Sequence, residues 1–189
     1  MEYKNIKDDY VSLVVDALQN VDVEYFEIKQ YGTENAKRRE RVFCYELYHQ
    51  MRKIQERRKL LDLTINGEIN KTGHPQIIEN FDPDFVIHRQ GSMKYNYAVV
   101  EVKTAKDKRG IFKDFETIKC MVNCYGYKIG MFLITGTDLA WFVQEILPEI
   151  KDPNLKSNEE PNEGQIYVIC KNNHDSIPDI ATLHELRCK

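Results

Sequence analysis

The spacing of apolar residues along the chain predicts helices and strands that alternate, as in an α/β protein. The segment 34–59 contains neither Gly nor Pro. Within it, Phe43, Leu47 and Ile54 fall inside an arc of about 40° on a helical wheel, which makes one apolar stripe. We therefore expect a helix over this segment, with its stripe packed against a sheet.

A β-hairpin is predicted in the middle of the chain. The apolar run 85–87 is typical of a short strand, the Gly-Ser pair at 91–92 of a turn, and the run 97–103 of a second strand. Side chains alternate between the two faces of a strand, so Glu101 and Lys103 should project to the same face. Charged residues inside such an apolar strand indicate a function.

Further elements are expected on both sides of this hairpin. A strand or hairpin is predicted over 61–69, with Asn66 and Gly67 as its turn. The remaining expected elements are a flanking helix within 1–33, a helix over 111–125, a strand over 129–135, a helix over 138–150 and a strand over 165–170. A chain of 189 residues that is 42% hydrophobic suits one domain over its whole length.

Two carboxylates and a lysine in this pattern point to one site. Asp84 opens the first strand of the hairpin, and Pro83 fixes the backbone direction in which Asp84 leaves the loop. Hard divalent cations such as Mg²⁺ take oxygen ligands, often one or two carboxylates with waters and substrate phosphate oxygens. Asp84 and Glu101 are suitable ligands of this kind. Lys103 could orient an attacking water or stabilise charge on the phosphate.

The pair Pro83-Asp84 followed by Glu101-x-Lys103 resembles the signature of the PD-(D/E)xK, or restriction-endonuclease-like, nuclease superfamily. The resemblance implies an α/β core of order α-β-β-β-α-β, with a central mixed sheet flanked by helices, over about 37–135. It also implies a Mg²⁺- or Mn²⁺-dependent endonuclease that hydrolyses phosphodiester bonds. Its substrate would be DNA more readily than RNA.

The resemblance implies two further metal ligands, and it leaves the two ends of the chain unassigned. Many members carry a glutamate on the helix before the sheet, and this role falls most readily on Glu46. The backbone carbonyl of Val102 would be a further ligand. The segments 1–33 and 136–189 lie outside the resemblance as additions to the core. Glu46 could equally be an ordinary glutamate on the helix flank with Gln50 as its i,i+4 partner.

The net charge of −3 conceals two basic windows. Residues 37–59 hold nine Lys or Arg and three Glu, and residues 103–119 hold six Lys or Arg and three acids. The candidates for phosphate-backbone contacts are Lys106, Lys108 and Arg109 after the predicted site, and Lys37, Arg38, Arg39 and Arg41 before it. The basic run 57–59 is interpreted as a solvated helix end favoured by the helix dipole. Tyr45 and Tyr48 are interpreted as packing or flank residues and not as a base-stacking platform.

The five cysteines are irregularly spaced, which is more typical of reduced thiols than of a disulfide framework. Four residues near the end of the chain have side chains that suit zinc, namely Cys170, His174, His184 and Cys188. Such spacing often arises by chance, so a buried strand end and a polar turn are the preferred interpretation of the first two.

Two other functions stay open. One is a catalytically inactive relative of the nucleases that binds nucleic acid or a partner protein, although the intact Asp84, Glu101 and Lys103 favour an enzyme. The other is a small α/β protein of unrelated function whose E-x-K is a strand with a salt-bridged edge. In that case the three residues would not converge. The sequence contains no Gly-rich phosphate loop, Ser-His-Asp arrangement or His-Glu-x-x-His pattern in support of another enzyme class.

The chain begins without the apolar region of a signal peptide, and no apolar run is long enough for a membrane span. We therefore expect a cytoplasmic protein with no membrane partner. The expected partner is nucleic acid, DNA more readily than RNA. A homodimer would place one site on each of two strands.

Overall fold

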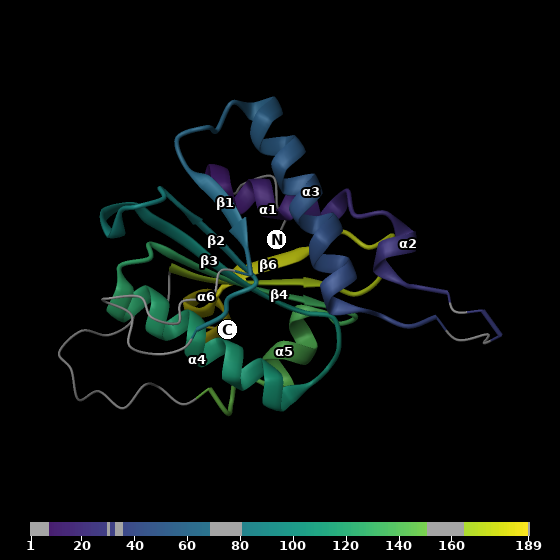
Figure 1. Ribbon diagram of the computed structural model, residues 1–189. Helices are drawn as coiled ribbons and strands as arrows, with labels where there is room; N and C mark the ends of the chain where they lie inside the picture. Colours follow the sequence, from purple (N-terminus) through teal and green to yellow (C-terminus); the bar gives the residue numbers. More distant parts are fainter. Residues whose placement is uncertain (1–7, 30, 33–35, 69–80, 151–164, 189) are drawn as a thin grey trace.

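The computed structural model describes residues 8–29, 31–32, 36–68, 81–150 and 165–188. These residues form an α/β fold with one six-stranded mixed sheet and helices on both of its faces (Figure 1). The expectation of an α/β protein with a central mixed sheet flanked by helices is therefore confirmed.

The strands lie in the sheet in the order in which they follow one another in the chain. They are β1 (Thr64–Gly67), β2 (Phe85–His88), β3 (Asn96–Lys103), β4 (Ile129–Thr135), β5 (Ile166–Lys171) and β6 (Asp179–Thr182). The strand β2 is antiparallel to both β1 and β3, the strands β3, β4 and β5 run parallel, and β6 is antiparallel to β5. The strands β3 and β4 are thus the two central strands of the sheet.

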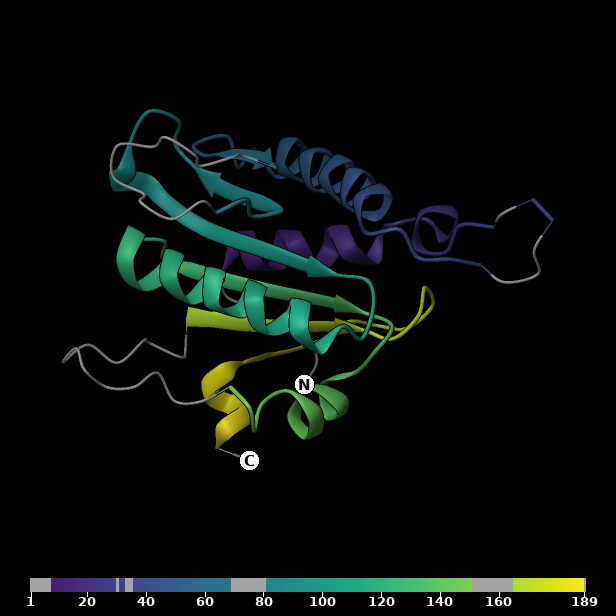
Figure 2. The same ribbon diagram turned by 60° about the horizontal axis from the view of Figure 1, so that its bottom comes forward.

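The helices divide between the two faces. They are α1 (Asp9–Gln19), α2 (Val23–Phe26), α3 (Glu40–Arg58), α4 (Lys108–Tyr125), α5 (Leu139–Glu145) and α6 (Leu183–Arg187), with a short 3₁₀ turn at Met93–Tyr95. Figures 1 and 2 show α1 and α3 on one face and α4 and α5 on the other, and their buried residues form two separate cores. Within the described ranges, none of the helices combines the length and the apolar character that crossing a bilayer requires.

The interior strand β3 is buried on both faces, which explains its nearly continuous apolar sequence. Val100 and Val102 pack in the core beneath α1 and α3. Val99 packs in the core beneath α4, and Glu101 faces the same helix. The alternation predicted for this strand is therefore present, and it directs Glu101 into the layer between sheet and helix.

The helices α1 and α3 are joined by an ion pair at the end of α3. The guanidinium of Arg58 binds the carboxylate of Asp16 and donates a hydrogen bond of 3.0 Å to the hydroxyl of Ser12. The interpretation of residues 57–59 as a solvated helix end is therefore wrong for Arg58. Its side chain reaches a neighbouring helix that the local sequence does not reveal.

The predicted hairpin is confirmed as β2 and β3, with its turn at Gly91, whose φ of +73° favours glycine. The helix predicted over 34–59 is α3, and the one predicted over 111–125 is α4. The strand predicted over 129–135 is β4.

The turn predicted at Asn66 and Gly67 is wrong. Both residues belong to β1 and pair with residues of β2. Ile69, the last residue of the predicted segment, lies outside the described residues. Pairing along a neighbouring strand holds the Asn-Gly pair extended, although its local preference is a tight turn.

The helix predicted over 138–150 is shorter than expected. It begins after Asp138, whose side chain accepts a hydrogen bond from the N–H of Trp141, and it ends at Glu145. Pro148 follows closely, and a proline inside the helix would remove a backbone hydrogen bond and clash with the preceding turn.

The close packing of α4 on the sheet leads to the first testable prediction. A Cβ placed on Gly130 of β4 would overlap Cγ2 of Ile118 on α4. The φ of Gly130 is not positive, so a side chain there meets a steric cost and no backbone strain. Gly130→Ala should destabilise the protein by about 1–3 kcal/mol in urea unfolding, as overpacking does elsewhere.

A double-mutant cycle provides the control. Ile118→Ala removes the overlapping carbon, so Gly130→Ala should cost less in that background than in the parent. An equal cost in both backgrounds would mean that the added methyl group meets something other than Ile118.

Candidate functional site

The candidate site lies where β2 and β3 separate. Phe85 and Val100 form the last pair of this antiparallel ladder, so Asp84 and Glu101 are the next residues on the two strands. The Asp84 side chain takes the place of a strand partner, because its Oδ2 accepts a hydrogen bond of 2.7 Å from the N–H of Val102. This contact anchors Asp84 to β3.

Asp84 and Glu101 project to the same face of the sheet. Val86 and Val99 both pack beneath α4, and alternation along each strand then places the two acids on that side. Their carboxyl groups are close enough for a side-chain hydrogen bond between them. The register expected from the sequence is therefore confirmed, and the two predicted ligands converge.

Burial dominates the electrostatics of this pair. Glu101 is only 5% exposed, and burial together with the charges of Asp84 and Asp114 raises its pKa well above the ordinary range. Burial also raises the pKa of Asp84 to about 6, although the N–H of Val102 opposes this. Burial and the like charges therefore both favour the protonated forms of this pair.

Lys103 is held by two acids from different helices. Its Nζ lies 2.7 Å from Oδ2 of Asp114 on α4 and 3.3 Å from Oε1 of Glu40 at the start of α3. Burial lowers the pKa of Lys103, but the contact with Asp114 and the charges of Glu40 and Asp84 outweigh it and raise the pKa. We call Lys103, Asp114 and Glu40 the lysine clamp.

The first turn of α4 leaves room for the lysine. A Cβ placed on Gly110 would lie 3.2 Å from Cε of Lys103 and 3.1 Å from Cγ of Asp107. Glycine at this position therefore lets the aliphatic part of Lys103 pass along the helix toward Asp114.

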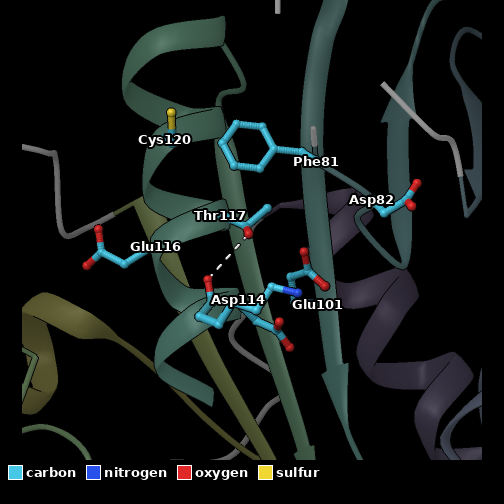
Figure 3. Close-up of a pocket in the computed structure, with 8 residues that line it drawn as sticks. Phe81, Asp82, Glu101, Asp114, Glu116, Thr117 and Cys120 are labelled. Carbon is cyan, nitrogen blue, oxygen red and sulfur yellow. Dashed lines mark hydrogen bonds between the residues drawn. The ribbon is translucent and has the colours of Figure 1, made fainter. Parts of the chain in front are cut away.

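A pocket of about 440 Å³ opens beside Glu101, between β3 and α4 (Figure 3). Its lining residues are Phe81, Asp82, Glu101, Lys113, Asp114, Glu116, Thr117 and Cys120. Figure 3 shows Glu101 on its strand across from Thr117 and Asp114 on the helix. Four of the eight lining residues are acidic and one is basic, so the pocket attracts cations and repels phosphates.

The structure brings a different helix carboxylate to the site from the one that the resemblance implies. Glu46 accepts a hydrogen bond from the side-chain amide of Gln50, which is the alternative arrangement of a glutamate on the helix flank. Glu40, six residues earlier, contacts Lys103 and raises the pKa of Asp84. Because Glu40 is the first residue of α3, it lies before the periodic stripe from which the helix is predicted.

Asp114 is a second acid that the sequence reasoning does not single out, although a signal is present. It lies within the buried stripe of α4, beside Ile111 and Phe115. A charged residue at such a position is unusual unless it is paired. Its Oδ2 is buried and, despite the short contact with Lys103, has no hydrogen bond of suitable geometry among the described residues.

The residues fit a hard divalent cation, although they do not form a complete metal site on their own. In the part of the chain that the structure describes, no three His, Cys, Asp or Glu side chains are grouped as metal ligands. Mg²⁺ needs only one or two carboxylates when waters and substrate phosphates complete its coordination. Asp84 and Glu101 supply these, and Asp114 lines the adjoining pocket. The Val102 carbonyl as a further ligand stays a prediction.

The three basic residues predicted after the site are exposed at the start of α4. Lys108 is paired with Glu145 at 2.6 Å, and the Nζ of Lys106 lies 5.2 Å from the centre of the Trp141 ring. Arg109 is the third. Their contact with nucleic acid stays a prediction, and Lys108 would have to leave Glu145 to make it.

The basic segment before α3 is divided in the structure. Arg38 pairs with Glu27 at 3.1 Å and lies over the ring of Phe26, so it has a structural role. The other three, Lys37, Arg39 and Arg41, are exposed.

The four residues considered for zinc do not form one group. Cys170 is fully buried beneath α5 and α6, whereas the ring of His174 meets Phe26 in the other core. His184 and Cys188 are neighbours on α6 and its end, with Nε2 and Sγ 3.7 Å apart. All five cysteines are free thiols in the structure.

Comparison with known proteins adds no relative. No family model matches the sequence, and no curated protein or solved structure matches it at a significant level. Any function assigned to the chain must therefore be argued from the site itself.

The raised pKa of Asp84 predicts a pH dependence of stability. The unfolded chain releases this proton near pH 4, and the folded protein holds it until about 6, so the folded state binds more protons between these values. In EDTA, the free energy of unfolding should therefore fall as pH rises through this window, by about 3 kcal/mol at most from Asp84 alone.

Asp84→Asn is the matched variant, because its amide oxygen can still accept the hydrogen bond from Val102. It should flatten the pH dependence and, near pH 7 in EDTA, unfold at the same or a higher urea concentration than the parent. A variant that is clearly less stable near pH 7, with an unchanged pH profile, would make Asp84 a structural hydrogen-bonding residue.

The lysine clamp predicts an order of stabilities. Asp114→Ala leaves a buried cation without its closest partner and should cost about 3–5 kcal/mol. Glu40→Ala should cost less, because the Glu40 side chain is 40% exposed, and Glu116→Ala, at 69% exposed on the same helix as Asp114, should cost least. Thermal and urea unfolding of the three variants test the order, and a loss for Glu116→Ala equal to that for Asp114→Ala would contradict it.

Proposed function

We propose that this chain is a divalent-metal-dependent nuclease of the PD-(D/E)xK type. The observation that carries the proposal is the convergence of Asp84 and Glu101, with Lys103 on the same strand, at the point where β2 and β3 separate. Buried like charges oppose folding, and such costs are typical of functional sites.

Each residue has a distinct role in this proposal. Asp84 and Glu101 hold Mg²⁺ or Mn²⁺, which when bound supplies Lewis-acid activation. Lys103 orients the attacking water or stabilises negative charge on the phosphate. Asp114 and Glu40 keep the ammonium group charged and in place.

The order of elements supports a restriction-endonuclease-like core. The elements α3, β1, β2, β3, α4 and β4 follow one another as α-β-β-β-α-β over residues 40–135. The helix α1 precedes this core, and the elements from α5 onward follow it as additions.

DNA is the proposed substrate, with RNA as the second choice. Exposed basic residues surround the end of β3, with Arg39 and Arg41 at the start of α3 and Lys106 and Arg109 at the start of α4. Contacts of this kind bind a phosphate backbone without reading its sequence. A homodimer would give one site for each strand of a duplex.

An inactive relative that binds nucleic acid or a partner protein is the alternative, and one observation favours it. Lys103 is already paired with two carboxylates, as in a structural ion-pair network. The third possibility, a protein of unrelated function whose E-x-K is a strand with a salt-bridged edge, is disfavoured by the convergence of Asp84 and Glu101 at one point of the sheet.

Cleavage assays distinguish these functions. With Mg²⁺ or Mn²⁺, the purified protein should cleave single-stranded, double-stranded or branched DNA, or RNA, and EDTA should abolish cleavage. Asp84→Ala, Glu101→Ala and Lys103→Ala should each lower the rate by about 100-fold or more, the usual loss when a metal ligand or a charge-stabilising group is removed.

Glu40 and Glu46 provide a paired comparison on one helix. Because Glu40 contacts Lys103 and Glu46 contacts Gln50, Glu40→Ala should lower activity more than Glu46→Ala. Undiminished cleavage by Glu101→Ala, or activity that survives EDTA, would refute the nuclease assignment.

A further inference from the structure

The outward face of α3 carries a continuous row of basic and aromatic side chains. Its members, which we call the α3 row, are Arg41, Tyr45, His49, Arg52 and Lys53. Residues three and four apart lie one above the other on a helix, and the row from 41 to 53 spans about 18 Å. This length corresponds to several nucleotides of an extended strand.

The row starts at the candidate site. Glu40, the residue before Arg41, lies 3.3 Å from the Nζ of Lys103. Arg41 pairs at 3.3 Å with Glu68, whose N–H donates to the carbonyl of Asp84 at 3.0 Å. Figure 2 shows α3 beginning near the arrowhead of β3 and running back beside β1 and β2. The first turn of the row therefore lies close to the backbone of Asp84, and a strand along the row has to pass the end of β3 to reach the carboxylates on the α4 face.

Charge favours approach from this side. The pocket on the other side of Glu101 is lined by Asp82, Asp114 and Glu116, which repel a phosphate backbone. The α3 row contains three permanent cations. Lys53 is exposed, whereas Arg41 and Arg52 pair with the exposed Glu68 and Glu56 and would exchange these carboxylates for phosphates. A polyanion is thus attracted to α3 and repelled from the pocket beside α4.

Tyr45 differs from the other tyrosine of this segment. Tyr48 is packed, because its ring stacks on Phe85 and its hydroxyl donates to the carbonyl of Ile65. Tyr45 is 61% exposed, so it is a residue of the helix flank, as expected, and its ring is accessible to a ligand. It lies one turn from Arg41 and one turn from His49. An exposed ring beside a cationic side chain such as Arg41 is the arrangement on which unpaired bases stack in single-strand binding proteins.

We propose that the α3 row binds an unpaired strand of nucleic acid, with a base stacked on Tyr45 and phosphates on Arg41, Arg52 and Lys53. This inference rests on the proposed function, since the row delivers the strand to Asp84 and Glu101. It also specifies the substrate, because a duplex has no free base to stack on the ring. The chain therefore acts on single strands, overhangs or flaps in preference to continuous duplex.

Binding in EDTA tests the inference without cleavage. Fluorescence anisotropy is measured with a labelled oligothymidine of about 12 nucleotides and with a blunt duplex of the same length, a size that spans several stacking contacts. The parent should bind the single strand more tightly. Tyr45→Ala should weaken this binding about 5- to 100-fold, the usual loss for one stacked base, whereas Tyr45→Phe should stay within about twofold.

Tyr95→Ala is the matched control. Tyr95 is also exposed, at 39%, and it lies between basic residues, but its ring is covered by Arg89 at 4.2 Å and it is at the far end of the β2–β3 hairpin. It should leave binding unchanged. Arg41→Gln should lower the slope of log K against log salt by about 0.7, as expected for one phosphate contact to a single strand.

Two outcomes would overturn the inference, namely equal losses for Tyr45→Ala and Tyr95→Ala, or tighter binding of duplex with no effect of Tyr45→Ala. Thermal unfolding of each variant shows that it is folded. Failure of the proposed function is distinguishable, because it leaves single-strand binding intact and removes only the cleavage that Mg²⁺ or Mn²⁺ supports. If the protein cleaves nucleic acid but Tyr45→Ala binds the single strand as tightly as the parent, the proposed role of the α3 row is refuted and the nuclease proposal is not.

Discussion

The carboxyl group of Glu101 is buried in an interior strand beside a second carboxyl group, and the rest of the site depends on this constraint. Moving a carboxylate out of water is costly, and a neighbouring like charge adds to the cost. The protein compensates for it in part with the N–H of Val102 and the ammonium of Lys103. A proton or a bound cation removes the remaining repulsion. The same arrangement therefore costs stability, and under the proposed function a divalent cation would relieve this cost on binding.

The lysine clamp connects the two layers of the fold. Glu40 belongs to the helices on one face of the sheet and Asp114 to those on the other, and both reach Lys103 at the end of β3. The position of the ammonium group thus depends on how both helices are seated. The close approach of α4 to Gly130 and the space left by Gly110 are part of the same geometry. A shift of α4 would therefore change the contact between Asp114 and the ammonium group of Lys103.

The sequence predicts the local parts of this site and misses the distant ones. Alternation in β2 and β3 predicts Asp84 and Glu101 on one face, but the register that achieves it also includes a shift between Ile87 and His88 that the sequence does not reveal. Glu40 and Lys103 are 63 residues apart, and their contact depends on how a helix is seated on the sheet, which no local pattern encodes. At Asn66 and Gly67 a local pattern is present but misleading, because their strong turn preference gives way to pairing with β2. Tyr45 and Tyr48 are chemically identical, and the helical period places Tyr45 farther from the apolar stripe, but the stacking of Tyr48 on Phe85 is a tertiary contact that no local pattern encodes.

The hydrogen bond from Val102 to Asp84 has a consequence for observing the site. Most amides of a sheet interior donate to carbonyl groups, whose charge does not change, but this amide donates to a carboxyl oxygen. Hydrogen bonds to an ionised acceptor are shorter and stronger than those to a neutral one. The chemical shift of the Val102 amide should therefore follow the ionisation of Asp84. One backbone signal, visible by nuclear magnetic resonance without any label at the site, reports on the charge state of the whole cluster.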